Sequence, residues 1–172
     1  ERDKCEVVTL QAKCRCADDD ARNRTNCSTD EQNPPERDVD AVFLTHLHSD
    51  HVVGLPDLWL TGWLEAAYAQ RKGPFVVYGP VGTHNMMKGL QQAFDWDIQA
   101  RIADQNLSPE TIKSTVTEVQ PGQRFDFNGV KVTTIEVNHG ELLHPAFGYR
   151  IDYEGRSVTI SGDTRFSENL IK

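Results

Sequence analysis

The run His46-Leu47-His48-Ser49-Asp50-His51 constrains this chain more than any other feature, because it places four candidate metal ligands within six residues. Three of the six histidines in the chain lie in it. A hydrophobic segment at residues 39–45 leads into the run, and a loop at residues 52–56 follows it. The ligands are therefore predicted to lie at the end of a buried strand, where a rigid sheet holds side chains at fixed spacing. Imidazole together with carboxylate is typical of a zinc site, with manganese and iron as alternatives.

The spacing within the run indicates two metal ions rather than one. On an extended segment, His46 and His48 point to the same side and can bind one ion together. Asp50 and His51 follow after the chain turns, so we expect them to face a second point in space. Two-metal hydrolases hold their ions about 3.5–4 Å apart and activate a water molecule between them. The run is therefore interpreted as part of a dinuclear hydrolytic site.

Two residues further along the chain are candidate ligands for the same site. Asp163 follows the strand-like residues 157–160 and a glycine, Gly162, that allows close backbone approach, so its carboxylate can bridge two cations. Taken alone, an aspartate in this position is more typical of a helix or turn cap. His139 follows the strand-like residues 130–137. Together with the histidine run, both residues are predicted to bind metal.

Several motifs resemble the metallo-β-lactamase superfamily. The run Thr45-His46-Leu47-His48-Ser49-Asp50-His51 is similar to its signature loop. The segments Phe147-Gly148-Tyr149-Arg150 and Ser161-Gly162-Asp163-Thr164 resemble the branch that holds tRNase Z and the arylsulfatase-like phosphodiesterases, and residues 57–64 look most like the arylsulfatase-like group. The resemblance covers residues 39–172 and implies an α/β fold, the four-layer αββα sandwich, incomplete at both ends here. The histidine motif is much less specific for the substrate, because one fold hosts many chemistries.

The resemblance implies two divalent metal ions, zinc first, and one set of ligands for them: His46, His48, Asp50, His51, His139 and Asp163. The first ion would lie between two histidines of the signature loop and His139. The second would be held by Asp50 and His51, with Asp163 between the two ions. Asp50 is also the candidate catalytic residue. The family has a further histidine and a His-Glu pair beyond the Gly-Asp-Thr segment, and the sequence to Lys172 contains neither, so we expect an incomplete second metal site and leave the general acid unassigned.

The predicted activity is metal-assisted hydrolysis of an ester. By resemblance, the substrate is a small aryl sulfate or phosphodiester, or alternatively the 3′ end of a tRNA. The tRNase Z enzymes commonly carry an inserted arm that grips tRNA, whereas Arg150 here leads through a tight hairpin into residues 161–163. The formal charge of −8, from 18 basic and 26 acidic residues, also opposes binding of a polyanion. The small ester is therefore the main prediction, and a catalytically inactive metal-binding relative is the third reading.

The first 38 residues differ from the rest of the chain. They contain all four cysteines, which are Cys5, Cys14, Cys16 and Cys27. Because residues 17–38 are almost entirely polar, residues 1–38 are predicted to be a lead-in of uncertain order, before a partial hydrolase domain at residues 39–172. No strand of the kind that the family has before residue 39 is identifiable there. The cysteine spacing fits no zinc ribbon and favours unpaired thiols.

Beyond the histidine run, strand and helix patterns alternate, as in an α/β fold. Further strands are predicted at residues 75–78, 115–119, 123–127, 130–137, 149–153 and 156–160. A first helix is predicted from the apolar spacing of residues 58–67, closing near Arg71-Lys72-Gly73, and a second at residues 83–94, with its first residue as the cap. Residues 95–114 stay open between helix and loop. Trp59, in the first helix, is assigned to the core, with a substrate pocket as the alternative.

Length and composition indicate a single hydrophobic core, since the chain has 172 residues of which 38% are hydrophobic. No apolar run reaches the roughly 18 residues that span a membrane, and no signal peptide opens the sequence. We therefore expect a soluble protein, cytoplasmic or periplasmic, with a small-molecule ester as its partner in preference to nucleic acid and with no membrane partner. A homodimer is compatible with the resemblance.

Overall fold

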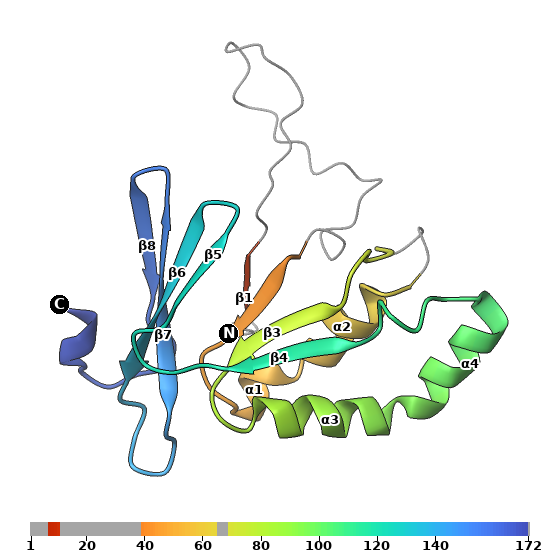
Figure 1. Cartoon of the computed structure of the whole chain (residues 1–172). Helices are drawn as coiled ribbons and strands as arrows, with labels where there is room; N and C mark the ends of the chain where they lie inside the picture. Colours follow the sequence, from red (N-terminus) through yellow and green to blue (C-terminus); the bar gives the residue numbers. More distant parts are fainter. Residues whose placement is uncertain (1–6, 11–38, 65–68, 172) are drawn as a thin grey trace, which may run out of the picture.

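The computed structural model describes residues 7–10, 39–64 and 69–171, the first of these through the backbone alone. Two four-stranded sheets pack against each other, and helices cover the other face of the first sheet (Figure 1). The strands are β1 (Val7–Leu10), β2 (Ala41–Leu44), β3 (Phe75–Gly79), β4 (Ser114–Glu118), β5 (Arg124–Phe127), β6 (Val130–Val137), β7 (Ala146–Tyr153) and β8 (Arg156–Ile160). The helices are α1 (Ser49–Val52), α2 (Leu55–Thr61), α3 (Thr83–Ala93), α4 (Asp95–Gln105) and the short 3₁₀ helix η2 (Glu168–Leu170).

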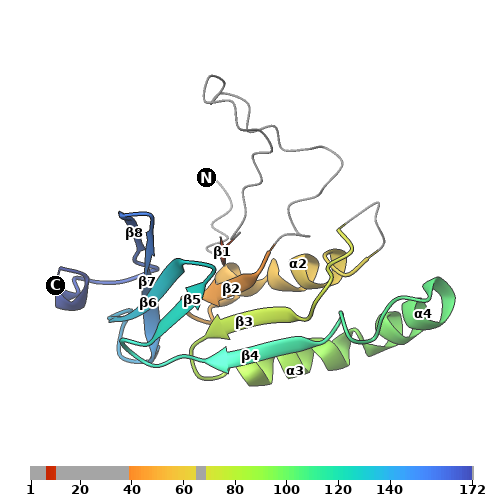
Figure 2. The ribbon, with the colours of Figure 1, turned by 45° about the horizontal axis from the view of Figure 1, so that its top comes forward.

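The first sheet, sheet A, has the strand order β1-β2-β3-β4. β1 is antiparallel to β2, whereas β2, β3 and β4 are parallel to one another. All four residues of β2 are buried, because the sheet is covered on both faces. Val42 and Leu44 pack on the helical side, and Ala41 and Phe43 pack between the two sheets. Helix α3 lies along β4, and α4 continues from it (Figure 2).

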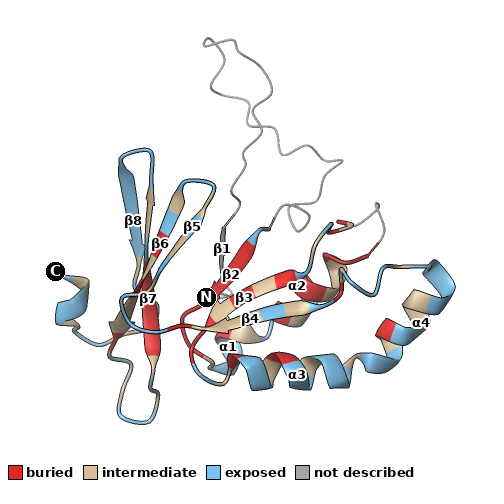
Figure 3. Ribbon diagram, viewed as in Figure 1, coloured by how far each residue is buried: buried red, intermediate tan, exposed pale blue. Residues whose placement is uncertain are grey.

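The second sheet, sheet B, is an antiparallel meander with the order β5-β6-β7-β8. Its two tight hairpins turn at Asn128-Gly129 and at Glu154-Gly155, where all four residues have positive φ. The first half of β7 is buried against sheet A, whereas β8 is exposed along most of its length (Figure 3). The described residues thus contribute one helical layer and two sheets of the αββα sandwich.

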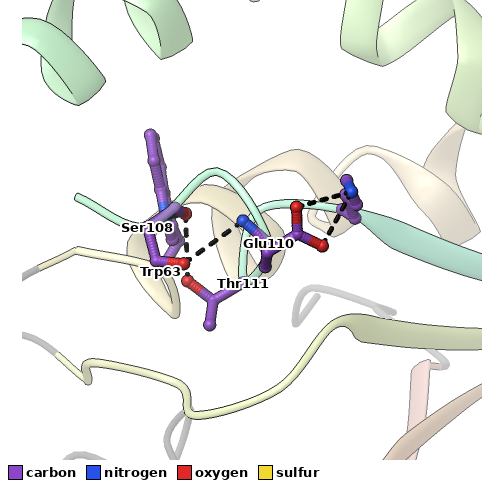
Figure 4. Close-up of polar contacts among 5 residues, drawn as sticks. Trp63, Ser108, Glu110 and Thr111 are labelled. Carbon is purple, nitrogen blue, oxygen red and sulfur yellow. Dashed lines mark hydrogen bonds and ion pairs between the residues drawn. The ribbon is translucent and has the colours of Figure 1, made fainter.

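Two tryptophan side chains form hydrogen bonds between the α2 region and the segment before β4. Trp59 Nε1 donates a hydrogen bond to the carbonyl oxygen of Ile112 at 2.8 Å. Trp63 Nε1 donates to the carbonyl oxygen of Ser108 at 3.0 Å, and the hydroxyl of Thr111 donates to the same oxygen (Figure 4). Trp59 is only 1% exposed, so its assignment to the core is confirmed and the substrate-pocket alternative is wrong.

The two sheets are joined by direct hydrogen bonds at the end of β2. The Phe43 ring packs at 5.2 Å between centroids from the ring of Tyr149, whose hydroxyl donates to the carbonyl oxygen of Leu44 at 2.6 Å. Burial raises the pKa of the Tyr149 phenol, so the hydroxyl keeps its proton for this bond. Beside it, the Phe147 N–H donates to the carbonyl oxygen of Thr45 at 2.9 Å. The point where the histidine run begins is therefore fixed to sheet B.

The lead-in contains a strand that the sequence pattern does not indicate. β1 pairs along β2, with Val7 opposite Leu44 and Leu10 opposite Ala41. A run of four residues gives too little periodicity to be recognised alone, and its partner lies far along the chain. The cysteines lie outside the described residues, so their unpaired state stays a prediction.

One helical prediction needs correction in its bounds, and the structure assigns the segment that the sequence left open. The helix expected at residues 58–67 begins earlier, because Pro56 is accommodated in the first turn of α2, and it ends at the C-cap Gly62. Residues 65–68 lie outside the described ranges. The open segment 95–114 contains α4 followed by a loop. No helix in the described ranges is both long and apolar enough to cross a membrane.

The start of α3 is capped by a distant carboxylate rather than by its own first residue. Gly82 occupies the N-cap position with a φ of 104°, and the hydroxyl of Thr83 donates to the carbonyl oxygen of Pro80. Oε1 of Glu118 accepts hydrogen bonds from the backbone N–H groups of Gly82 and His84, at 2.8 and 3.2 Å. The predicted role of Thr83 as the cap is therefore wrong, because the end of β4 supplies the acceptor.

Candidate metal centre

The histidine run begins directly after the buried strand β2. Thr45 and His46 follow the strand and are both buried. His48 then occupies the position before α1, a single helical turn that carries Asp50 and His51. This turn directs His51 toward His46, with ring centroids 4.2 Å apart, while the side chain of Asp50 stays 72% exposed. The change of direction after His48 agrees with the spacing argument.

Sheet B supplies the two remaining candidate ligands. β6 and β8 are both antiparallel to β7, so their C-terminal ends lie at the same end of the sheet. His139 follows β6 and Asp163 follows β8. The hydrogen bond from Phe147 to Thr45 brings this end of sheet B to the end of β2. All the side chains that the sequence predicts as ligands therefore meet in one region, although they come from both sheets.

Three histidines form the first group of candidate ligands: His46, His48 and His139. One ring nitrogen from each lies within 4.8 Å of those of the other two. The Nε2 atom of His139 is 3.3 Å from Nδ1 of His48. Two nitrogen ligands of a tetrahedral zinc ion are separated by about 3.3 Å, because each Zn–N bond is about 2.0–2.1 Å long. This spacing fits two ligands of one tetrahedral ion.

The second group comprises His46, His51 and Asp163, whose ligand atoms also lie within 4.8 Å of one another. Oδ2 of Asp163 is 3.4 Å from Nε2 of His51, and Oδ2 of Asp50 is 3.5 Å from the same nitrogen. Asp50 is not a member of this group and its side chain is largely exposed, so it lies at the edge of the group. His46 belongs to both groups, which the spacing along the sequence does not indicate.

The environment of His46 favours the form of imidazole that binds metal. Burial and the neighbouring histidines His51, His139 and His48 lower its pKa from 6.5 to about 4, so the ring is neutral at neutral pH. Its Nδ1 lies 3.1 Å from the hydroxyl oxygen of Thr45. Its Nε2 is buried and has no hydrogen-bond partner in the described structure. A buried, neutral nitrogen left for a ligand fits a divalent cation such as zinc.

Gly162 allows Asp163 to reach this centre. Its φ is +63°, and a Cβ atom built on it would lie 2.9 Å from Cβ of Thr45 and 3.0 Å from the carbonyl oxygen of Phe147. Real Cβ atoms essentially never come as close as the first of these distances. Only a residue without a side chain therefore lets the loop after β8 pass this close to β2.

Thr45 is the residue that sequence reasoning missed. A hydroxyl on the second ring nitrogen of a metal-binding histidine fixes its tautomer and orientation. Its place before the first histidine was the available signal, but threonine is also common in strands, so the sequence alone did not separate the two roles. His144 is exposed and belongs to neither ligand group among the described residues.

Comparison with known proteins gives a consistent result. Residues 20–172 match the family model described as "Beta-lactamase superfamily domain". The chain is 36% identical over 129 residues to a ribonuclease Z of Mycobacterium marinum, covering 73% of this chain and 44% of that protein. It is 36% identical over 128 residues to a ribonuclease Z of Mycobacterium bovis, with coverages of 73% and 44%. The chain thus spans less than half the length of these curated relatives.

Among solved structures, the metallo-β-lactamase fold protein YhfI from Bacillus subtilis is similar to this chain, with a TM-score of 0.54 and 18% sequence identity. The superposition covers 80% of this chain and 46% of that one. At this level of identity the similarity concerns the fold alone. It agrees with the two sheets and the helical layer described above.

Proposed function

Because the chain belongs to the metallo-β-lactamase superfamily, we propose that it is a metal-dependent hydrolase that cleaves phosphodiester bonds in RNA, in the manner of ribonuclease Z. The observation that carries the proposal is the pair of ligand groups that share His46. Two overlapping groups of imidazoles and a carboxylate suit two neighbouring divalent cations. Zinc is the cation that we place first, with manganese and iron as alternatives.

The proposed ligands are the residues that the sequence predicts: His46, His48, Asp50, His51, His139 and Asp163. Bound divalent ions would supply Lewis-acid stabilisation of phosphoryl oxygens and would lower the pKa of a water molecule. The hydroxyl of Thr45 would hold the ring of His46 in one orientation. Oδ2 of Asp50, exposed beside His51, would accept a proton from water at the substrate side of the centre.

RNA takes first place as the substrate, which reverses the order suggested by the sequence alone. The hairpin between β7 and β8 is as tight as predicted, with its turn at Glu154-Gly155. Relatives named ribonuclease Z nevertheless match this chain at 36% identity, so the tight hairpin is weak evidence against an RNA substrate. The formal charge of −8 still favours a small aryl phosphodiester or sulfate as the second candidate, since it opposes a polyanion.

The first test is the metal content of the purified chain by elemental analysis, followed by cleavage assays on a precursor tRNA, on bis(4-nitrophenyl) phosphate and on 4-nitrophenyl sulfate. We expect about two divalent ions per chain. We expect the metal-loaded chain to cleave the tRNA precursor at a single position near its 3′ end, faster than it cleaves either small ester.

A matched pair of variants controls for folding. His46→Ala removes a residue of both ligand groups, whereas His84→Ala removes an exposed histidine of α3. Metal and activity should fall in the first variant and persist in the second. A chain that binds no divalent ion would contradict the proposal, and a metal-loaded chain that cleaves only the small esters would leave the second candidate in its place.

A further inference from the structure

Arg165 lies on the loop that carries Asp163, and this loop is hydrogen-bonded to the loop that carries His139. The backbone N–H of Arg165 donates to the carbonyl oxygen of Asn138 at 2.7 Å. The hydroxyl of Thr164 donates to the same oxygen at 3.2 Å. The position of Arg165 relative to the candidate metal centre is therefore set by two hydrogen bonds between the loops that supply ligands.

The guanidinium group of Arg165 lies beside the residue that follows His139. A Cβ atom built on Gly140 would be 3.9 Å from Nη2 of Arg165. Gly140 has a φ of +134°, and its N–H donates to Oδ1 of Asn138 at 3.1 Å. The charged end of the arginine is thus next to the backbone at the first ligand group rather than directed away along sheet B.

The charge of Arg165 is not neutralised within the described part of the chain. Two other arginines there form ion pairs, Arg101 with Asp97 at 2.9 Å and Arg150 with Asp152 at 2.9 Å. Arg165 is exposed and forms no such pair with the carboxylates of residues 39–64 and 69–171. A solvent-accessible cation beside a metal centre is suited to bind an anion there.

We propose that Arg165 binds the phosphate group of the substrate, by donating N–H hydrogen bonds from its guanidinium to non-bridging phosphate oxygens at the metal centre. This inference rests on the proposed function and adds a residue for substrate recognition to it. A planar guanidinium matches the spacing of two phosphate oxygens, and such charge-assisted pairs are stronger than neutral hydrogen bonds. The ligand chemistry is a phosphodiester, whether it comes from RNA or from a small aryl diester.

The test measures binding rather than turnover. Zinc-loaded protein is titrated by calorimetry with inorganic phosphate, with bis(4-nitrophenyl) phosphate and with a short single-stranded RNA; the last two separate the sources of the diester. Arg165→Gln should weaken phosphate binding about tenfold or more, because a charge-assisted hydrogen bond is lost. Arg165→Lys should recover part of it, since it keeps the charge but not the planar fork. The zinc content should stay the same in all variants.

The control is Arg156→Gln, which removes the same charge from an exposed arginine at the turn end of β8. Its phosphate affinity should stay within about twofold of the native value if only position 165 contributes. Equal affinities of native protein and Arg165→Gln for all three probes, with zinc still bound, would overturn the inference and leave the proposed function standing. If the native chain binds no zinc, both proposals fail together.

Discussion

His46 belongs to both ligand groups, and its Nε2 atom is buried with no hydrogen-bond partner in the described structure. Thr45 holds the other ring nitrogen, so His46 has one orientation available. The centre is therefore asymmetric, because His48 serves one group only and His46 serves two. This asymmetry can be measured by removing each histidine in turn.

We predict that His46→Ala lowers the metal content to below about half an ion per chain, whereas His48→Ala leaves about one ion in the other group. Elemental analysis after dialysis measures both, with His84→Ala as the control, since that exposed residue lies in α3. Equal losses in the two ligand variants would contradict the shared role of His46.

Gly162→Ala should destabilise the protein and displace Asp163. Alanine at a φ of +63° has a backbone strain of about 1–2 kcal/mol. Its Cβ would also clash with the side chain of Thr45, and such overpacking costs about 1–3 kcal/mol. Gly122 is a matched control, because its φ is +72° and a Cβ there would meet nothing within 4 Å. Denaturant unfolding should show the larger loss for Gly162→Ala, together with lower zinc affinity; equal losses would mean that the close approach is unimportant.

At the residue scale, the sequence predicted which side chains would gather at the candidate centre, but it did not predict how they are grouped. The spacing of His46, His48 and His51 indicated a metal site because so few other roles use that pattern. The membership of His46 in both groups depends on the one-turn helix α1, and the peripheral place of Asp50 depends on its exposure there. The grouping of His46 and the place of Asp50 both depend on the geometry of the single helical turn α1, and a short sequence specifies such geometry weakly.

Helix α3 shows how an element can depend on a residue far along the chain. The unpaired N–H groups at its first turn are satisfied by Glu118 at the end of β4, which also places a negative charge at the positive end of the helix. The helix is thereby fastened to sheet A at the strand that it covers.

Glu118→Ala should lower the free energy of unfolding by about 1–2 kcal/mol, since it removes the cap and its charge. Glu118→Gln should cost less, because an amide oxygen still accepts a hydrogen bond. Glu110→Ala is the control, since Glu110 forms only an exposed surface pair with Lys113, and such pairs contribute at most about 1 kcal/mol. A loss in Glu118→Ala no larger than in this control would show that the cap is unimportant.

Every strand except β1 was predicted close to its observed bounds, although β7 begins at Ala146 rather than at residue 149. Alternating patterns and two turn dipeptides identify β5 to β8 locally, because each strand pairs with its neighbour in sequence. β1 was missed since its pairing with β2 is not local, and the cap of α3 was missed for the same reason. Local signals predict local contacts only.

On the scale of the whole molecule, the candidate centre exists only where the two sheets meet. Sheet A contributes the histidine run, and sheet B contributes His139 and Asp163. The hydroxyl of Tyr149, which donates to Leu44, is one of the bonds that hold the sheets in this relation. Removal of the Tyr149 hydroxyl should therefore lower both the free energy of unfolding and the affinity for metal.

Tyr149→Phe should destabilise the protein by about 1–3 kcal/mol, because the buried carbonyl of Leu44 loses its donor. The native protein should also lose stability as the pH rises above 10, since the raised pKa keeps Tyr149 protonated when folded while the unfolded phenol, with its ordinary pKa of 10.0, ionises. Because Tyr149→Phe has no phenol at this position, it should lack the part of the stability loss above pH 10 that comes from Tyr149. Unfolding curves at pH 8 and pH 11 measure both effects; Tyr153→Phe, half-exposed at the end of β7, is the control.

The sharing of the centre between two sheets has a consequence for the unfolded chain. Residues 46 and 163 are brought together by the fold, so an ion bound between them would act as a reversible cross-link that closes a loop over most of the sequence. The entropy of closing such a loop grows only as the logarithm of its length, so a long loop costs little more than a short one. By mass action, the melting temperature would then rise with the concentration of free metal and fall in chelator, which makes metal supply a determinant of how long the folded molecule persists.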